Sequence, residues 1–167
     1  PASLAMFMLE VTWWSQRALW HLMFSGVFER HPDLQWVNTE SGTAWVPDTL
    51  ARLDDFYDRM KTSKYGSEAI FGGAAVAEMS LTPSEYWQRQ CHVGASFLRP
   101  TETAVVRQIG VDKVMWGSDY PHIEGSHPNT DEHLRLTFGE MTTDEATQIL
   151  TTNVARLYRF DVAALQA

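Results

Sequence analysis

The chain has 167 residues, of which 44% are hydrophobic, and is therefore long and apolar enough for one domain with a sizeable core. Its formal net charge of −8 argues against nucleic-acid and anionic-membrane partners, because both require a basic surface. Its single cysteine, Cys91, excludes an internal disulfide and favours a reducing cytoplasm, and we expect a small buried side chain there. No apolar stretch reaches the ~20 residues of a transmembrane helix.

The first half of the chain predicts two long helices around a short strand. Residues 4–29 contain no proline and are apolar on nearly all sides, so we expect one helix that packs on more than one partner, another subunit among them. Residues 34–39 favour a strand and residues 45–60 a helix. Residues 61–80 are rich in Gly, Ser and Ala, which predicts a long loop with a short helix near 74–79.

The second half alternates helices with strands. Thr82-Pro83-Ser84-Glu85 indicates the start of a helix that continues to about residue 90. The patterns further along favour strands over residues 91–97 and 113–117, and helices over residues 102–109, 131–139 and 143–153.

This alternation predicts an α/β fold with parallel strands and right-handed crossovers. A three-stranded parallel sheet offers too little surface for so many bulky helices. We therefore expect residues 1–167 to form a single domain, with no separate second domain, that is part of something larger.

The strongest functional signal is Val114-Met115-Trp116-Gly117-Ser118-Asp119-Tyr120-Pro121-His122. A short apolar run ends abruptly in an acid, as in a buried parallel strand that delivers one carboxylate to a site at its C-terminal tip. Asp119 is therefore the leading candidate for a metal ligand or proton-transfer group. The structural alternative is an Asx-turn or a helix cap.

Glu40 is the second candidate. It follows the strand predicted over residues 34–39 and precedes Ser41-Gly42, an arrangement parallel to that of Asp119. Two acids at the tips of parallel strands converge on one pocket, where one could bind a metal while the other moves a proton. The alternative is a glutamate that is hydrogen-bonded to backbone or paired with an arginine.

Aromatic and histidine side chains supply candidate pocket residues. Trp45 and Trp116 are placed to line a pocket, and Tyr120 and His122 follow Asp119 directly. An imidazole beside an acid is common in metal and acid–base sites, although a solvated loop histidine is the alternative for both His122 and His127.

Several motifs are absent from the chain: a glycine-rich phosphate loop, a paired-cysteine metal site, a Gly-x-Ser-x-Gly elbow and a His-x-His pair. The missing phosphate loop disfavours a small flavodoxin-like binding domain.

The chain resembles the C-terminal part of the amidohydrolase-related enzymes that include aminocarboxymuconate-semialdehyde decarboxylase and the resorcylate-type decarboxylases. The Gly117-Ser118-Asp119-Tyr120-Pro121 segment is moderately specific alone, and the ordered set is far more so. The matching pieces are residues 25–34, 40–47, 52–54, 116–122 and 153–158.

The resemblance implies a (β/α)₈ barrel with a metal, usually zinc, at its C-terminal mouth. The three strands would be about the sixth to the eighth. Asp119 would match the metal-ligand aspartate after strand eight, and Glu40 would fall where many members carry a histidine that assists proton transfer.

By the same resemblance, the family's metal ligands after strands one and five have no counterpart here. We therefore expect the chain to be a fragment, inactive alone, of a metal-dependent hydrolase or non-oxidative decarboxylase that acts on a small carboxylated or cyclic substrate. Glu40 and Asp119 would be catalytic, Asp119 would bind the metal, and Trp45, Trp116, Tyr120 and His122 would line the pocket. A homo-oligomer is expected. The alternative function is a non-catalytic half-barrel module that is completed by self-association through its apolar first helix.

Overall fold

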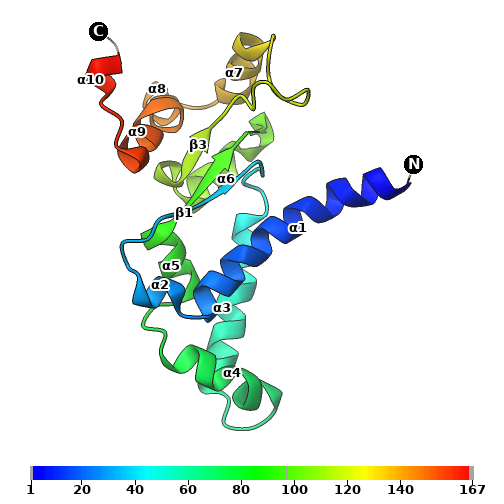
Figure 1. The fold of residues 1–167 in the computed structure, drawn as a ribbon, viewed down its shortest axis with the longest axis vertical. Coiled ribbons are helices and arrows are strands. Elements are labelled where there is room, and N and C mark those ends of the chain that lie inside the picture. Colours follow the sequence, from blue (N-terminus) through cyan, green and yellow to red (C-terminus); the bar gives the residue numbers. More distant parts are fainter. Residues whose placement is uncertain (1, 97, 166–167) are drawn as a thin grey trace. The chain divides into compact units, whose positions relative to one another are not determined.

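The computed structural model describes residues 2–96 and 98–165 (Figure 1). The chain divides into two compact units. The first comprises Pro1–Asn38 and Asp48–Cys91, and the second comprises Thr39–Pro47 and His92–Ala167. The expected single domain over all 167 residues stays a prediction.

The first unit opens with α1 (Ala2–Phe24), the long helix expected from the sequence. Gly26 adopts a left-handed conformation, with φ at 71°, and the chain turns there into the short helix α2 (Val27–Arg30). The prediction of one helix over residues 4–29 is therefore wrong at its C-terminal end, where the turn at Gly26 divides it.

The helix α3 (Val46–Thr62) begins and ends close to its predicted bounds. Its buried side chains recur every three or four residues, as expected for one face of an amphipathic helix. They include Leu50, Leu53, Tyr57 and Met60.

The helix α4 (Ser67–Ala77) occupies much of the segment that was predicted to be a loop. Gly72 lies so close to α3 that a Cβ atom there would be 1.9 Å from Sδ of Met60. The small residues that suggested a loop therefore allow a close helix–helix approach. The loop prediction is wrong for this reason over residues 67–73, and the short helix expected near residues 74–79 overlaps the end of α4.

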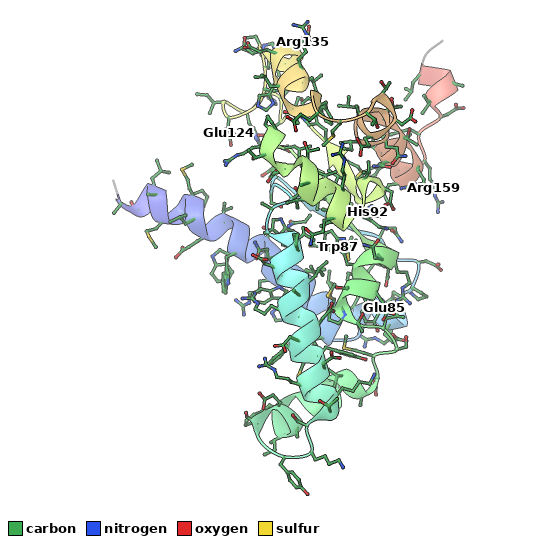
Figure 2. All side chains as sticks on the ribbon, turned by 180° about the vertical axis from the view of Figure 1, so that it is seen from behind. Glu85, Trp87, His92, Glu124, Arg135 and Arg159 are labelled. Atoms are coloured by element: carbon green, nitrogen blue, oxygen red, sulfur yellow. The ribbon has the colours of Figure 1, made fainter. Side chains whose placement is uncertain are left out.

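The helix α5 (Pro83–Gln90) begins where the sequence indicated. Thr82 and Glu85 form a reciprocal capping box, in which the backbone N–H of each is accepted by the side chain of the other. Tyr86 and Trp87 are fully buried, and Tyr86 donates a hydrogen bond to Glu29. Figure 2 labels Glu85 and Trp87 of this helix. The helix therefore contributes large aromatic side chains to the core of the first unit.

Three strands form a sheet in the order β1 (Trp36–Thr39), β2 (Cys91–Ala95) and β3 (Val114–Trp116). β2 and β3 are parallel, with Val93 opposite Val114 and Ala95 opposite Trp116. The predicted α/β class with a small parallel sheet is confirmed. Residue 97, the last residue of the second predicted strand, lies outside the described residues. Cys91 is buried, as expected.

The second unit connects its strands with η1 (Pro100–Glu102), α6 (Thr103–Ile109) and η2 (Val111–Lys113). It ends with α7 (Thr130–Phe138), α8 (Thr143–Thr147), the π-helical turn η3 (Gln148–Thr152), α9 (Asn153–Tyr158) and α10 (Val162–Leu165). The predicted helix over residues 143–153 therefore continues through a π-turn to Tyr158.

Within the described residues, no helix combines the length and the apolar character needed to cross a membrane.

Candidate metal centre

The two acids singled out from the sequence follow strands of the sheet. Glu40 comes directly after β1, and Asp119 comes three residues after β3. Both adopt left-handed backbone conformations, with φ of 55° for Glu40 and 58° for Asp119. Among the described non-glycine residues, Arg159 is the one other with a positive φ. This conformation is unfavourable for residues with a Cβ atom and is enriched at functional sites.

A tight turn positions Asp119. The backbone N–H of His122 donates to the carbonyl of Asp119 at 2.8 Å, and that of Ser126 donates to the carbonyl of Ser118 at 2.9 Å. Gly125 packs against this turn, since a Cβ atom there would lie 2.8 Å from the Ser118 carbonyl oxygen. The turn leaves the Asp119 side chain only 8% exposed, with Oδ2 3.2 Å from Nδ1 of His122.

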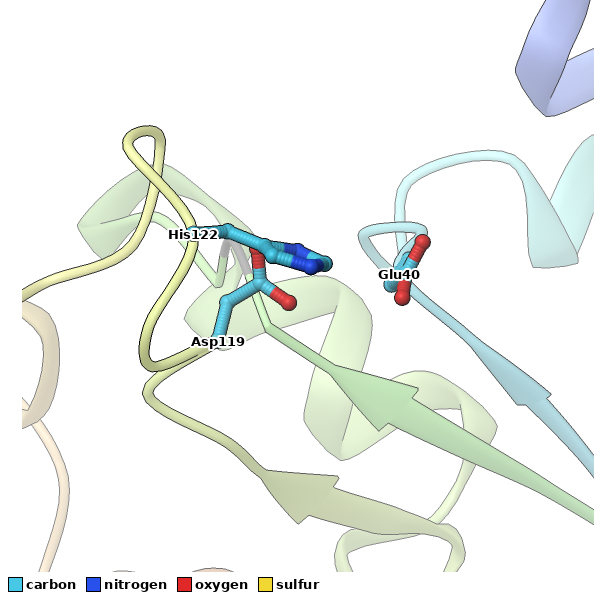
Figure 3. A group of neighbouring side chains, drawn as sticks. All are labelled: Glu40, Asp119 and His122. Carbon is cyan, nitrogen blue, oxygen red and sulfur yellow. The ribbon is translucent and has the colours of Figure 1, made fainter.

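Glu40, Asp119 and His122 converge at this edge of the sheet. Each offers one ligand atom, and these atoms all lie within 4.8 Å of one another. Figure 3 shows the three side chains directed toward one another, with Glu40 next to β1 and the other two on the loop after β3.

The donor set suits a divalent transition metal. Carboxylate oxygen and imidazole nitrogen bind zinc and manganese, and catalytic zinc commonly has three protein ligands. With metal–ligand bonds of about 2.1 Å, neighbouring ligands lie roughly 3–3.5 Å apart, so the 3.2 Å between Asp119 and His122 already fits. The Glu40 side chain is exposed, and its ligand atom lies within 4.8 Å of those of the other two residues. The three residues therefore fit a cation.

The remaining predicted site residues are aromatic and are not part of this cluster. Trp45 and Trp116 are partly buried. Tyr120 is 67% exposed, and its ring lies edge-on to His127 with 5.2 Å between the centroids. The roles of these three residues in a substrate pocket stay predictions.

His122 was assigned to the pocket lining, with a metal or acid–base role considered because it lies near an acid. The turn brings its imidazole to the Asp119 carboxylate. The available signal was the spacing of three residues, which a single turn can close. The cis Tyr120-Pro121 peptide bond between them is a feature that the sequence did not predict.

A small polar cavity of about 160 Å³ lies in the same unit. Arg99 from the loop after β2, Glu124 and Ser126 from the loop after β3, and His133 from α7 contribute to its lining. A larger cavity of about 360 Å³ in the first unit is mostly apolar, with Phe24 and Phe56 in its wall. Of the two, the smaller one has the larger share of polar groups, which orient a ligand.

A family model described as amidohydrolase matches residues 15–160. The match covers most of the chain, and the chain therefore belongs to the amidohydrolase family. Among proteins with curated descriptions, the comparison finds no match.

Solved structures share the fold. 5-Carboxyvanillate decarboxylase from Sphingomonas paucimobilis aligns with a TM-score of 0.65 at 24% identity, and an amidohydrolase from Mycobacterium avium subsp. paratuberculosis with 0.66 at 23%. A dihydroxybenzoic acid decarboxylase from a Polaromonas species, with bound manganese and the inhibitor 2-nitroresorcinol, gives 0.61 at 19%. Each alignment covers 87% of this chain, but only 39%, 33% and 39% of the respective structures.

Proposed function

We propose that this chain belongs to a metal-dependent enzyme that decarboxylates or hydrolyses a small carboxylated or cyclic molecule. The convergence of Glu40, Asp119 and His122 in an amidohydrolase-family chain supports this proposal. We favour non-oxidative decarboxylation over hydrolysis, because two of the structures with this fold are decarboxylases. The single cysteine supports a cytoplasmic location.

We also propose that residues outside these 167 complete the catalytic unit. The chain spans 39% and 33% of two structures with the same fold, which supports the idea that it supplies the last part of a larger barrel. Its three strands would then be about the sixth to the eighth of eight. The fragment would be inactive alone.

The chain's own residues take distinct roles. A bound divalent cation would polarise a substrate oxygen or activate a water molecule. Asp119 and His122 would hold the cation, since their ligand atoms already have the spacing of neighbouring ligands, and one carboxylate oxygen of Glu40 would be the third ligand. The other carboxylate oxygen of Glu40 would accept a proton from water during hydrolysis or, once protonated, would donate the proton that replaces CO₂ on the substrate carbon during decarboxylation.

The three ligand atoms are compatible with more than one metal. Two carboxylates and one imidazole suit both zinc, which the family resemblance implies, and manganese, which the Polaromonas structure holds. We propose zinc as the first metal to test and manganese as the second.

Metal titration of the 167-residue chain tests the proposal. We expect isothermal titration calorimetry to detect Zn²⁺ or Mn²⁺ binding, and Asp119→Asn to weaken it by at least about tenfold, because one ionised ligand is lost. Asp131→Asn, a substitution of the same kind at an exposed acid in the same unit, leaves the affinity unchanged. Equal affinity of the wild-type chain and Asp119→Asn would exclude the proposed site.

A second candidate function has its own supporting observation. The first half of α1 exposes large apolar side chains, among them Phe7 at 62% and Leu9 at 70%. Such a surface favours a non-catalytic module that is completed by association with a second copy of the chain. Metal-free, self-associated protein would favour this alternative.

A further inference from the structure

Glu102 is a buried carboxylate that joins two loops at the candidate metal centre. It ends η1, after β2, and the residue is 8% exposed. Its Oε1 accepts the backbone N–H of Ala44 at 3.3 Å, and its Oε2 accepts that of Arg99 at 3.2 Å. The carboxylate therefore links the loop after β1 to the loop after β2.

The loop that contains Glu40 is closely fitted to this carboxylate. A Cβ atom on Gly42 would lie only 2.7 Å from Oε1 of Glu102, so the backbone of the loop approaches the carboxylate to within contact distance. The contact lies two residues from Glu40, and the Ala44 hydrogen bond lies four residues from it. Glu102 thus acts on the loop at two points just after Glu40.

The loop has a physical need for such support. Glu40 is in the left-handed conformation, which persists only where surrounding contacts enforce it. The hydroxyl groups of Ser41 and Thr43 are buried and have no hydrogen-bond partner among the described residues, so no hydrogen bond from these side chains to that part of the chain fixes the loop. Glu102 supplies a specific polar contact instead.

We propose that Glu102 is a positioning residue that holds Glu40 in place opposite Asp119 and His122. The inference rests on the proposed function, because it assigns Glu102 to the same site. Glu102 is not among the three candidate ligands, so we expect it to affect the metal through Glu40. Mutation of a carboxylate that orients a metal ligand without itself binding the metal commonly lowers metal affinity by 10- to 100-fold.

The test compares Glu102→Ala in two backgrounds by Mn²⁺ titration. With Glu40 present, we expect Glu102→Ala to weaken Mn²⁺ binding about tenfold, because the loop is released. In the Glu40→Gln background, the same substitution should have no further effect, since the group that it positions has already been removed. Equal losses in both backgrounds, or no loss in either, would overturn the inference.

A second pair of variants checks the contact itself. Gly42→Ala forces a Cβ atom against Oε1 of Glu102 and should weaken Mn²⁺ binding, whereas combined with Glu102→Ala it should add little. Glu102→Gln keeps one acceptor oxygen and should fall between the wild-type chain and Glu102→Ala, which provides a folded variant if the alanine form is unstable. Thr103→Val removes the hydrogen bond to the Pro100 carbonyl in the same turn and should leave Mn²⁺ affinity unchanged.

Hydrogen exchange separates this inference from the proposed function. If the wild-type chain binds neither Mn²⁺ nor Zn²⁺, the proposed function fails, and exchange at the Ala44 amide decides the role of Glu102. Faster exchange of this amide in Glu102→Ala, with Thr103→Val unchanged, supports the positioning contact without the metal. Unchanged exchange overturns it.

Discussion

At the scale of single residues, the site depends on carboxylates held in an unfavourable backbone conformation. Glu40 and Asp119 both have positive φ, which costs a residue with a Cβ atom about 1 kcal/mol or more. In a strand-to-loop connection that served only structure, glycine would be the less costly choice. The presence of acids at these positions is what a functional site would require.

This argument predicts a trade-off between stability and metal binding. Glu40→Gly should raise the free energy of unfolding by about 0.5–1 kcal/mol, because glycine accepts φ near 55° without steric cost, and it should weaken metal binding. Arg159→Gly, at φ of 58° and outside the metal-ligand cluster, should stabilise the chain similarly and leave metal binding unchanged. Urea denaturation and metal titration measure both quantities, and a loss of stability in Glu40→Gly would contradict the argument.

The pKa of His92 predicts how the free energy of unfolding depends on pH. Its burial, with the charges of Lys113 and Arg156 nearby, lowers the pKa of His92 to about 4 from an ordinary value of 6.5. The unfolded chain therefore binds this proton more readily than the folded chain. The contribution of His92 to stability is present above pH 6.5 and is lost as the pH falls toward 4, by up to about 3 kcal/mol.

Urea denaturation between pH 7 and pH 4 measures this effect. His92→Gln, which has no titrating group, should lose less stability than the wild-type chain over this range. Parallel pH profiles for the two proteins would show that His92 is not responsible.

At the scale of secondary-structure elements, one buried amide connects β3 to the C-terminal helices. Asn153, 2% exposed at the start of α9, donates from Nδ2 to the carbonyls of Val111 and Val114, each at 2.8 Å. These two carbonyls lie at the beginnings of η2 and β3. The strand that leads to Asp119 is therefore anchored at its start by this side chain.

Asn153→Ala should be strongly destabilising. It leaves two carbonyl oxygens without this donor, and the expected loss is about 2–3 kcal/mol in the free energy of unfolding. Thr152→Ala, at the exposed neighbouring position, should change it by less than about 0.5 kcal/mol. Similar denaturation midpoints for the two variants would contradict the anchoring role.

The prediction of secondary-structure elements from the sequence succeeded where signals between neighbouring residues were sufficient. The apolar run of β3 ending at an acid and the Thr82–Glu85 capping box are both local signals, and both elements form where expected. It failed for α4, because the small residues around Gly72 serve a contact with Met60 that is remote in sequence. Local composition cannot distinguish a flexible segment from one that packs closely.

At the scale of the whole molecule, α1 carries an unusually apolar exposed surface. Its large side chains are 44–70% exposed, at Leu4, Met6, Phe7, Met8, Leu9, Val11, Trp13 and Trp14. Eight such side chains expose on the order of 800 Å², which is about what one partner contributes to a standard interface. We propose that a second copy of the chain covers this surface.

The 167-residue chain should therefore self-associate. Light scattering coupled to size-exclusion chromatography should give at least the mass of a dimer, and Phe7→Glu should shift it toward the monomer, because a charge is buried without a partner. Phe71→Glu, at an 84% exposed position on α4, is the matched control and should leave the mass unchanged. A chain that stays monomeric at high concentration, with no metal bound, would argue against association through α1.

The sequence by itself determined the α/β class, the positions of the three strands, and the two acids that follow strand ends, because strand periodicity and the abrupt change from apolar to acidic residues are local properties. Only the tertiary structure decided which side chains meet. It brought His122 to Asp119 through a turn. It also brought Glu102 to the loop that contains Glu40, where it accepts a hydrogen bond from Ala44, 58 positions earlier in the sequence. Such contacts depend on backbone conformations such as the left-handed Glu40 and on close approaches such as that at Gly42, which the packing of remote segments imposes.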